Sequence, residues 1–486
     1  MTSVADNVLR GKERHLKILI LSIISLALVG IVKILFNMIV GRSFGTDSVA
    51  VLGMSSVVLS FSFLIITLCS TGFMNIASKF ISDALSKNDA GRARRIYDII
   101  IRDTVIISLA IAAIIGLFSQ ELSIILNVDV IYFALAVPII VVGSLYYILR
   151  AVFYALGAVT PYFKLEILSD AAFFIVLAGV ILLGSKGLIL LPFAIMYLIF
   201  IVLSFMRIHR TLAPNKTRVT LQMKEEYVFG GLSTLGTVMS VAVTYLGTIF
   251  VGAMLGAYSA GIFTAALTTA SLALLIQSGF AQVLMPEIAF LWGAQKSEEL
   301  RKDIMTWTMV LGLSAALFIG PMVILRKDLL SILFGADYLA GMNVVIIMLI
   351  GTYMLTVART ALLSLQSTDR LKLIATVSAV ATIAAIISWV FLIPLWGMEG
   401  AALGYLISCV INSIIPLESA RRKWKLDLKP LIVPNLSFAL LIIAVVALTG
   451  LDNFFERLIS TVLFVLIFTA VNYSKIRITL TAIKNR

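Results

Sequence analysis

Eight charged side chains lie within or at the ends of long apolar runs of this 486-residue sequence. A charge at the centre of a membrane helix costs about 2.5–3.5 kcal/mol on insertion scales, so each of them needs a partner, water or a functional role. They are the basic residues Lys33, Arg42, Arg150, Lys164 and Arg359 and the acidic residues Glu166, Asp170 and Glu287. Basic groups at several depths suit an anionic or phosphate-bearing substrate.

Lys33 lies about seventeen residues from the start of its apolar run. At that depth its side chain does not easily reach the headgroups, so we expect it to face a water-filled cavity. Arg359 is interpreted in the same way, and Arg42 lies at the outer end of the first run. We predict that Lys33, Arg42, Arg150 and Arg359 are candidate substrate-binding cations of such a cavity. Snorkelling to the inner headgroups is an equal alternative for Arg150, Lys164 and Glu287.

Glu166 and Asp170 are four residues apart, which places both carboxyl groups on one face of a helix. In one interpretation, Lys164 or Arg150 neutralises them and their role is structural. In the other, Glu166, Asp170 or Glu287 carries a proton or another coupling ion. Both interpretations remain open at this point.

The composition shows which elements must position these residues. Hydrophobic residues make up 61% of the chain and Asp, Glu, Lys and Arg only 13%, against roughly 45–50% and about 25% in soluble proteins. Because backbone groups in lipid must be satisfied within a segment, we expect an all-α integral membrane protein with about 14 transmembrane helices. The predicted spans are residues 16–41, 48–77, 96–119, 130–155, 163–184, 187–206, 228–255, 260–290, 304–325, 340–366, 371–395, 398–416, 430–450 and 455–474.

The distribution of Lys and Arg predicts how the chain is oriented. With fourteen spans, 29 of the 38 basic residues fall on the side that holds both termini and only five on the other side. The positive-inside rule then places both termini in the cytoplasm of a multi-pass protein of the cell membrane. The net charge of +13 is therefore explained by topology and by contacts with anionic membrane lipids, and no nucleic-acid partner is required.

Residue types that build metal, redox or nucleotide sites are scarce. Cys69 and Cys409 lie far apart in apolar runs, and the only histidines are His15 and His209. These residues make neither a disulfide framework nor a zinc motif, so we expect no metal and no cofactor. The chain also lacks the GxxxxGK[ST] motif of ATPases and is not expected to hydrolyse ATP itself.

An internal repeat relates the first six predicted spans to the next six. Two span junctions match at a constant separation of 211 residues, with Gly41, Gly45 and Ser48 corresponding to Gly252, Gly256 and Ser259. A second match pairs Arg150 with Arg359 at a separation of 209. A repeat of six spans keeps both halves the same way up, with a substrate path between them.

The repeat predicts three parts of the chain. They are an N-terminal lobe over residues 1–226, a C-terminal lobe over residues 227–416 and an added helix pair over residues 417–486. We expect one lobe to rock against the other, with gating at the glycine-rich junctions that contain Gly41, Gly45, Gly252 and Gly256.

Two further segments carry a resemblance to a known family. Residues 333–341 read LFGADYLAG, and residues 392–408 read LIPLWGMEGAALGYLIS. Both segments, together with the junction GRSFGTD at residues 41–47, resemble the polysaccharide-biosynthesis (Wzx-like) flippases of the multidrug/oligosaccharidyl-lipid/polysaccharide (MOP) exporter superfamily. The resemblance covers essentially the whole chain.

The resemblance implies two six-helix lobes arranged in a V, a MATE-like fold, with two extra C-terminal helices. It implies that the protein is not an enzyme but a flippase, which moves polyprenyl-(di)phosphate-linked oligosaccharide from the cytoplasmic to the outer leaflet for surface polysaccharide or glycan biosynthesis. Lys33 and Arg42 would match in kind the cationic cavity of such flippases. The expected partners are this lipid-linked oligosaccharide and the polymerase or glycosyltransferases of the same pathway, and the chain is expected to act as a monomer.

Two other functions remain as alternatives. A cation-coupled drug or metabolite antiporter of the same superfamily would need a deep carboxylate in its cavity. A membrane-embedded glycosyltransferase or ligase ranks lower, because it would need a sizeable extramembrane domain. The longest hydrophilic stretch, about residues 207–227, is short and basic.

Overall fold

The computed structural model describes residues 30–87, 89–212, 223–368, 370–447 and 453–484, and these residues form helices with no strand among them. Ten of the described helices are long and apolar enough to cross a membrane, and a shorter apolar helix, Lys429–Val445, lies before the last of them. The predicted fold class, an all-α membrane protein, is confirmed. By their contacts the residues divide into two compact units, which are described in turn.

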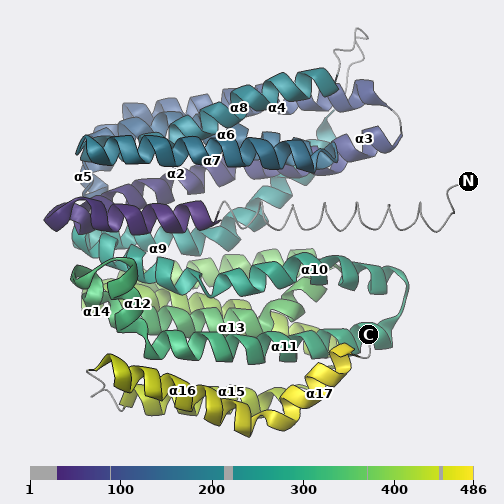
Figure 1. Cartoon of the computed structure of the whole chain (residues 1–486). Coiled ribbons are helices and arrows are strands. Elements are labelled where there is room, and N and C mark those ends of the chain that lie inside the picture. The colour runs from purple at the N-terminus through teal and green to yellow at the C-terminus, as the bar shows by residue number, and fades with distance from the viewer. Residues whose placement is uncertain (1–29, 88, 213–222, 369, 448–452, 485–486) are drawn as a thin grey trace, which may run out of the picture. The chain divides into compact units, whose positions relative to one another are not determined.

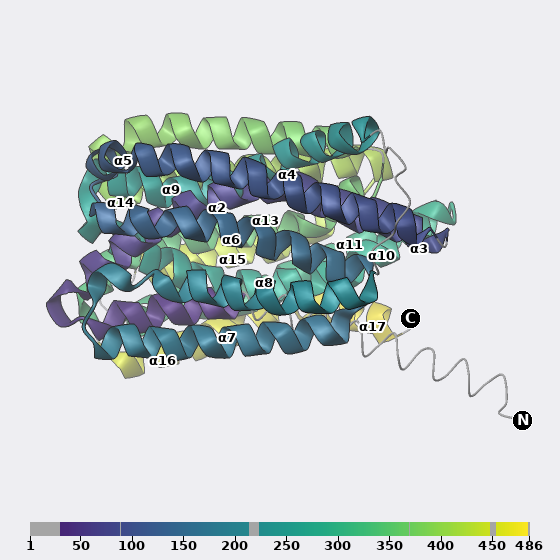
Figure 2. The same cartoon turned by 90° about the horizontal axis from the view of Figure 1, so that it is seen from above.

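Unit 1 comprises described residues 30–36 and 43–245. Its first helix covers residues 30–43, of which residues 37–42 belong to unit 2. Figure 2 shows α4, α6, α8 and α7 running side by side. The elements that follow the first helix are η1 (Gly45–Asp47), α2 (Ser48–Ile76), η2 (Ala77–Ile81), α3 (Ser82–Ser86), α4 (Ala90–Leu117), α5 (Ser119–Leu126), α6 (Val130–Ala155), α7 (Val159–Leu182), η3 (Lys186–Leu188), α8 (Leu191–Thr211) and the first part of α9 (Lys224–Ser271).

Unit 2 comprises residues 37–42 and the described residues from 246 onward. The last three helices, yellow in Figure 1, pack against α11. Its elements are the second part of α9, then α10 (Leu274–Gly293), α11 (Ser297–Ile324), α12 (Arg326–Leu333), η4 (Ala336–Gly341), α13 (Met342–Gln366), α14 (Leu371–Trp424), η5 (Lys429–Leu431), α15 (Ile432–Ala447), α16 (Phe454–Val471) and α17 (Tyr473–Lys484).

Breaks in the two longest helices fall between predicted spans. In α9 the break is at Gly256, which has φ 84° and ψ 175°. In α14 it is at Trp396 (φ −130°) and Gly397 (φ 56°, ψ −133°). A side chain disfavours such backbone angles, so glycine is the residue that lets the chain leave the helix here. The first break lies between the predicted spans 228–255 and 260–290. The second lies between the predicted spans 371–395 and 398–416.

The segment LIPLWGMEGAALGYLIS folds the two parts of α14 back against each other. A Cβ atom on Gly400 would lie 2.1 Å from the Leu392 carbonyl oxygen, and one on Gly404 would lie 2.5 Å from the Trp389 ring. The Trp389 indole N–H donates to the Ala401 carbonyl oxygen at 2.9 Å. The glycines therefore permit a close packing that even an alanine methyl group would disturb.

The two units have related orders of elements. In each, a short eight-residue helix follows a long apolar helix, α5 after α4 in unit 1 and α12 after α11 in unit 2. Glycines with positive φ also occur at the two matched junctions, Gly45 (φ 57°) and Gly256 (φ 84°). The duplication itself stays a prediction.

One loop is shorter than expected. The prediction ends the second span at residue 77 and begins the third at residue 96, but helical structure continues through the π turn η2 and α3 to Ser86. Helix α4 then begins at Ala90, because the side chain of Asp89 accepts a hydrogen bond from the Arg92 backbone N–H at 2.8 Å. This N-cap starts the helix in a polar stretch where hydropathy gives no signal.

Aromatic packing fills the centre of unit 1. The rings of Phe36, Phe173 and Phe193 are fully buried and meet edge to face, with centroids 4.8–6.0 Å apart. They join the first helix, α7 and α8. Each such ring removes a large apolar area from its surroundings, and the edge-to-face geometry adds specificity to the packing.

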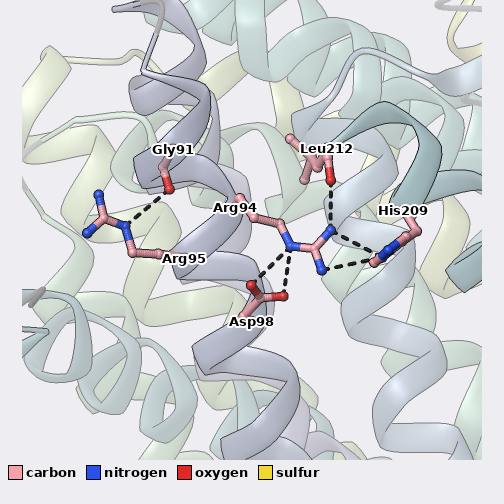
Figure 3. Close-up of polar contacts among 6 residues, drawn as sticks. All are labelled: Gly91, Arg94, Arg95, Asp98, His209 and Leu212. Atoms are coloured by element: carbon pink, nitrogen blue, oxygen red, sulfur yellow. Dashed lines mark hydrogen bonds and ion pairs between the residues drawn. The ribbon is translucent and has the colours of Figure 1, made fainter. Parts of the chain in front are cut away.

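Arg94 ties α4 to the end of α8, as Figure 3 shows. Its Nε donates to the Asp98 carboxylate at 2.9 and 3.0 Å, and its Nη1 donates to the Leu212 carbonyl oxygen at 2.7 Å. His209 Nδ1 lies 3.3 Å from the same Nη1. Because a guanidinium only donates, this contact requires that Nδ1 accept and that the neutral ring carry its proton on Nε2.

Large apolar side chains cover the outer faces of several helices. Leu117 is 80% exposed on α4, Leu182 is 87% exposed on α7, and Phe455 is 73% exposed on α16. Contiguous apolar surface of this kind would be unfavourable in water and is expected where a helix faces lipid. The hydropathy of the helices and their exposed faces thus identify a multi-pass membrane protein.

Candidate functional site

Lys33 projects from the first helix over an aromatic ring. Its Nζ lies 3.4 Å from the centroid of the Phe63 ring on α2 and 5.8 Å from the centroid of Tyr245 on α9. The negative face of an aromatic ring attracts an ammonium group and replaces part of its hydration, with an energy of about 0.5–2 kcal/mol. The aromatic contacts therefore help a lysine to remain this far inside a membrane helix.

The first helix, α6, α7 and α8 enclose one small cavity beside Lys33. Glu166 and Asp170, predicted to lie on one face of a helix, both line it. Its volume is about 10 Å³, about the room that one water molecule needs. The structure thus brings the deepest predicted cation and two of the three predicted acids to the same place. The remaining lining residues are Val32, Tyr146, Phe193, Met196 and Tyr197.

Glu166 is held from the neighbouring helix. Its side chain is buried, and the Tyr146 hydroxyl donates a hydrogen bond to Glu166 Oε1. The Tyr146 ring is itself fixed between Tyr197 and Phe200, with centroids 4.7 and 4.8 Å away. The donor therefore has little freedom to leave the carboxylate.

The same part of unit 1 contains buried polar atoms whose hydrogen-bonding capacity is unused. Arg150 on α6 acts electrostatically on both carboxyl groups, and its guanidinium carbon lies 5.5 Å from the centroid of Tyr162. Within the described ranges, no ion pair within 4.0 Å includes Lys33, Arg150, Glu166 or Asp170. The atoms that find no hydrogen-bond partner among the described residues are Arg150 Nη2, Tyr154 Oη, Tyr162 Oη, Glu166 Oε2 and Asp170 Oδ2.

We refer to Lys33, Tyr146, Arg150, Glu166 and Asp170 as the polar cluster. Leaving a buried donor or acceptor unsatisfied costs about 1–3 kcal/mol. A cluster of side chains with several such unsatisfied atoms is suited to accept a proton, an ion or a polar group of a ligand. The tyrosine donor was missed by sequence reasoning, although Tyr146, Tyr147 and Tyr154 within one apolar run were a visible signal.

The side chain of Arg42, which belongs to the first helix, contacts the C-terminal end of α12 in unit 2. Its Nη2 donates to the carbonyl oxygen of Ser331 at 2.8 Å and also to that of Ile332. These carbonyls belong to the last turn of α12, where a cation is favourable. The neighbouring Gly41 carbonyl oxygen accepts a hydrogen bond from the Tyr338 hydroxyl at 3.1 Å. The segment LFGADYLAG, to which Tyr338 belongs, thus holds the end of the first helix.

The other predicted site residues are not members of the polar cluster. Arg359 is partly buried on α13, where its Nε has no hydrogen-bond partner in the described part of the chain, and Glu287 is partly buried on α10. Lys164 is exposed on α7 and lines a different pocket, so the acids on its own helix do not depend on it. Gly252 is buried within α9, four residues before the break at Gly256.

When the chain is compared with known proteins, it matches solved structures. No protein-family model and no curated protein matches the sequence. A structure of the lipid II flippase MurJ in an inward closed conformation matches with a TM-score of 0.71 and 16% identity, covering 94% of this chain and 99% of that chain. The chain has the fold of this flippase structure. The expected flippase-like architecture is confirmed at the level of the fold.

Solved structures of other transporters also match the fold of this chain. A mutant of the Vibrio cholerae MATE transporter VcmN matches with a TM-score of 0.61 and 15% identity over 84% of this chain and 95% of that one. A MOP superfamily transporter from Pyrococcus furiosus, described as having a binding pocket of reverse polarity, gives 0.56 and 14% over 84% and 95%. At these identities, the comparisons establish the fold and leave the substrate to the site.

Proposed function

We propose that this protein flips polyprenyl-(di)phosphate-linked oligosaccharide from the cytoplasmic to the outer leaflet of the cell membrane by alternating access, for surface polysaccharide or glycan synthesis. The observation that carries the proposal is Lys33, a cation deep in a membrane helix that lines a polar cavity and has no recorded ion pair among the described residues. A diphosphate or an acidic sugar is the kind of group that such a cation attracts.

The structural comparison also supports a lipid-linked cargo. The match to the lipid II flippase covers 94% of this chain, whereas the VcmN and Pyrococcus furiosus transporter matches each cover 84%. The proposed orientation, with both termini in the cytoplasm, rests on the distribution of basic residues. The proposed partners in the same pathway are the polymerase and glycosyltransferases that build and consume the glycan.

A second candidate function is a cation-coupled antiporter for drugs or metabolites. It is favoured by one specific observation, because Glu166 and Asp170 both line the cavity beside Lys33. Paired carboxyl groups within membrane helices are typical of proton relays in transporters. The same acids are also suited to couple an ion gradient to flipping. The transported substrate must therefore be identified by a direct transport assay.

The test is translocation in proteoliposomes of a fluorescent polyprenyl-diphosphate oligosaccharide, measured as the fraction that becomes accessible to a membrane-impermeant reagent. We expect Lys33→Ala to reduce the initial rate about ten-fold or more, since charge-assisted contacts contribute about 1.5–3 kcal/mol. Lys33→Arg should retain most of the rate. The control is Lys87→Ala, an exposed lysine paired with Asp83 on the same turn of α3.

The outcomes separate the two functions. A Lys33→Ala variant that is normally folded and flips at the wild-type rate would remove the role assigned to Lys33. No flipping by the wild type, together with ion-driven export of a dye, would establish the antiporter. In cells, loss of the protein should trap lipid-linked glycan on the cytoplasmic leaflet, and normal surface glycan without a redundant protein would contradict the proposal.

A further inference from the structure

A pocket outside the polar cluster lies on the surface of unit 1, between α7 and α8. It has a volume of about 470 Å³ and is lined by Thr160, Pro161, Lys164, Leu165, Leu203, Met206 and Arg207. The two helices are neighbours, as Figure 2 also shows. The pocket thus combines two basic side chains with apolar and small polar ones, and none of its lining residues is acidic.

The two cations lie at a similar depth along the helices. Lys164 is five residues after the start of α7 at Val159, and Arg207 is four residues before the end of α8 at Thr211. At 1.5 Å per residue these offsets are about 8 and 6 Å, which is headgroup depth for helices that cross a membrane. Both side chains are exposed at the surface of the unit.

The side chains deeper along the same two helices are apolar and exposed. Leu168 on α7 is 54% exposed, and Leu198 and Val202 on α8 are each 51% exposed. A ligand that fits this surface has a negatively charged head at Lys164 and Arg207 and a hydrocarbon tail that runs along the apolar part. Neither a free anion nor a neutral amphiphile would use both features.

We propose that the pocket between α7 and α8 binds the phosphate headgroup of an anionic membrane phospholipid, with an acyl chain lying along α7 and α8. The site is separate from the polar cluster and does not depend on the identity of the transported cargo. It assigns a specific place to the anionic-lipid contact that the basic residues of the sequence suggest only in general terms.

The test is lipid retention by the purified full-length chain, measured by native mass spectrometry during titration with phosphatidylglycerol or phosphatidylcholine. We expect one phosphatidylglycerol per chain to be held at this site, and the double variant Lys164→Ala/Arg207→Ala to bind it about thirty-fold more weakly, as expected for two basic residues beside a lipid phosphate. Lys164→Gln alone should weaken binding by a smaller factor.

The matched control removes the same charge elsewhere. Lys296→Ala/Arg301→Ala takes away two exposed cations that pair with Glu299 and Glu298 on α11, and it should leave the affinity for phosphatidylglycerol unchanged. A second variant, Leu203→Trp, fills the apolar side of the pocket and should weaken binding without a change of charge. If the double variant does not fold, Leu203→Trp still tests whether the pocket binds the lipid.

Three results would overturn the proposal. They are equal affinities for phosphatidylglycerol and phosphatidylcholine, equal losses in the double variant and in its charge-matched control, and displacement of the lipid by millimolar inorganic phosphate. The last result would identify the pocket as a site for a free anion. Retention of phosphatidylglycerol in the presence of phosphate supports the assignment to a lipid.

Discussion

Arg457 on α16 and Asp328 on α12 form a two-pronged ion pair. Arg457 Nε donates to Asp328 Oδ2 at 2.6 Å, and Nη2 donates to Oδ1 at 2.7 Å. Both side chains are mostly buried, and their exposed fractions are 8% and 15%. Arg326 is close by, and burial together with the charge of Arg457 lowers the pKa of the Arg326 guanidinium from its ordinary value. Asp328 is thus the counter-charge of Arg457 at a point where a second guanidinium lies nearby.

Removing Asp328 should destabilise unit 2. In Asp328→Asn the buried Arg457 loses its counter-charge, and breaking a buried pair in this way costs about 3–5 kcal/mol. The measurement is thermal unfolding of the purified protein in detergent. Arg422→Ala, which removes an exposed partner of Glu418, is the control and should change stability by less than about 0.5 kcal/mol. Equal effects of the two substitutions would show that the Asp328–Arg457 pair is dispensable.

Gly72 on α2 and Gly230 on α9 let two helices of unit 1 cross with their backbones in contact. A Cβ atom on Gly72 would lie 2.7 Å from Thr234 Oγ1 and 3.0 Å from the Gly230 carbonyl oxygen. We expect Gly72→Ala to cost about 1–3 kcal/mol, because the Thr234 side chain must move and the Gly230 backbone behind it leaves little room. Unfolding measurements check this, with Gly231→Ala as the control. A methyl group on Gly231 meets nothing within 4 Å, so alanine should stabilise the helix slightly. Destabilisation by both variants to the same extent would contradict the crossing.

Tyr146 and Glu166 should be energetically coupled. Tyr146→Phe removes the hydroxyl that donates to Glu166 and should destabilise the protein by about 1–3 kcal/mol. In the double variant with Glu166→Gln, the two losses should fall short of additivity by at least about 0.5 kcal/mol. Tyr473→Phe, at a position that is 62% exposed, is the control and should have no measurable effect. Strict additivity in the double-mutant cycle would mean that the hydrogen bond contributes nothing.

Gly256 should not tolerate a side chain. Its backbone, at φ 84° and ψ 175°, lies in a region that only glycine adopts easily, so Gly256→Ala should cost about 1–3 kcal/mol. If the break at this residue also takes part in gating, the variant should lower the flipping rate of the protein that remains folded. Gly293→Ala is the control, since a methyl group there meets nothing within 4 Å and the φ of Gly293 is ordinary. A Gly256→Ala protein with wild-type stability and rate would rule out both expectations.

Much of the fold follows from the sequence because the membrane restricts the choice of structure. Apolar runs give the spans, and a glycine such as Gly256 marks where one ends and another begins. The i,i+4 spacing of Glu166 and Asp170 correctly predicts a shared face. These features are local, so one segment of sequence is enough to find them.

The partners of the site residues could not be predicted in this way. The acceptors of Arg42 on α12 are 289 and 290 residues away in sequence, and the cavity of Lys33 is completed by side chains from three other helices. Contacts of this kind depend on which helices pack together, which hydropathy does not specify. The aromatic ring beneath Lys33 has no signature in the sequence, since Phe63 is one phenylalanine among 28.

The π turn η2, Ala77–Ile81, lies between α2 and α3. A π turn accommodates one residue more than an α-helical turn. Deleting a single residue within 77–81 should therefore restore regular α-helix while the faces of the flanking helices keep their directions. A single deletion in the middle of α2 would instead rotate everything beyond it by about 100°. Unit 1 therefore carries one extra helical residue at η2, and this is the place where a residue can be removed without rotating the helices on either side.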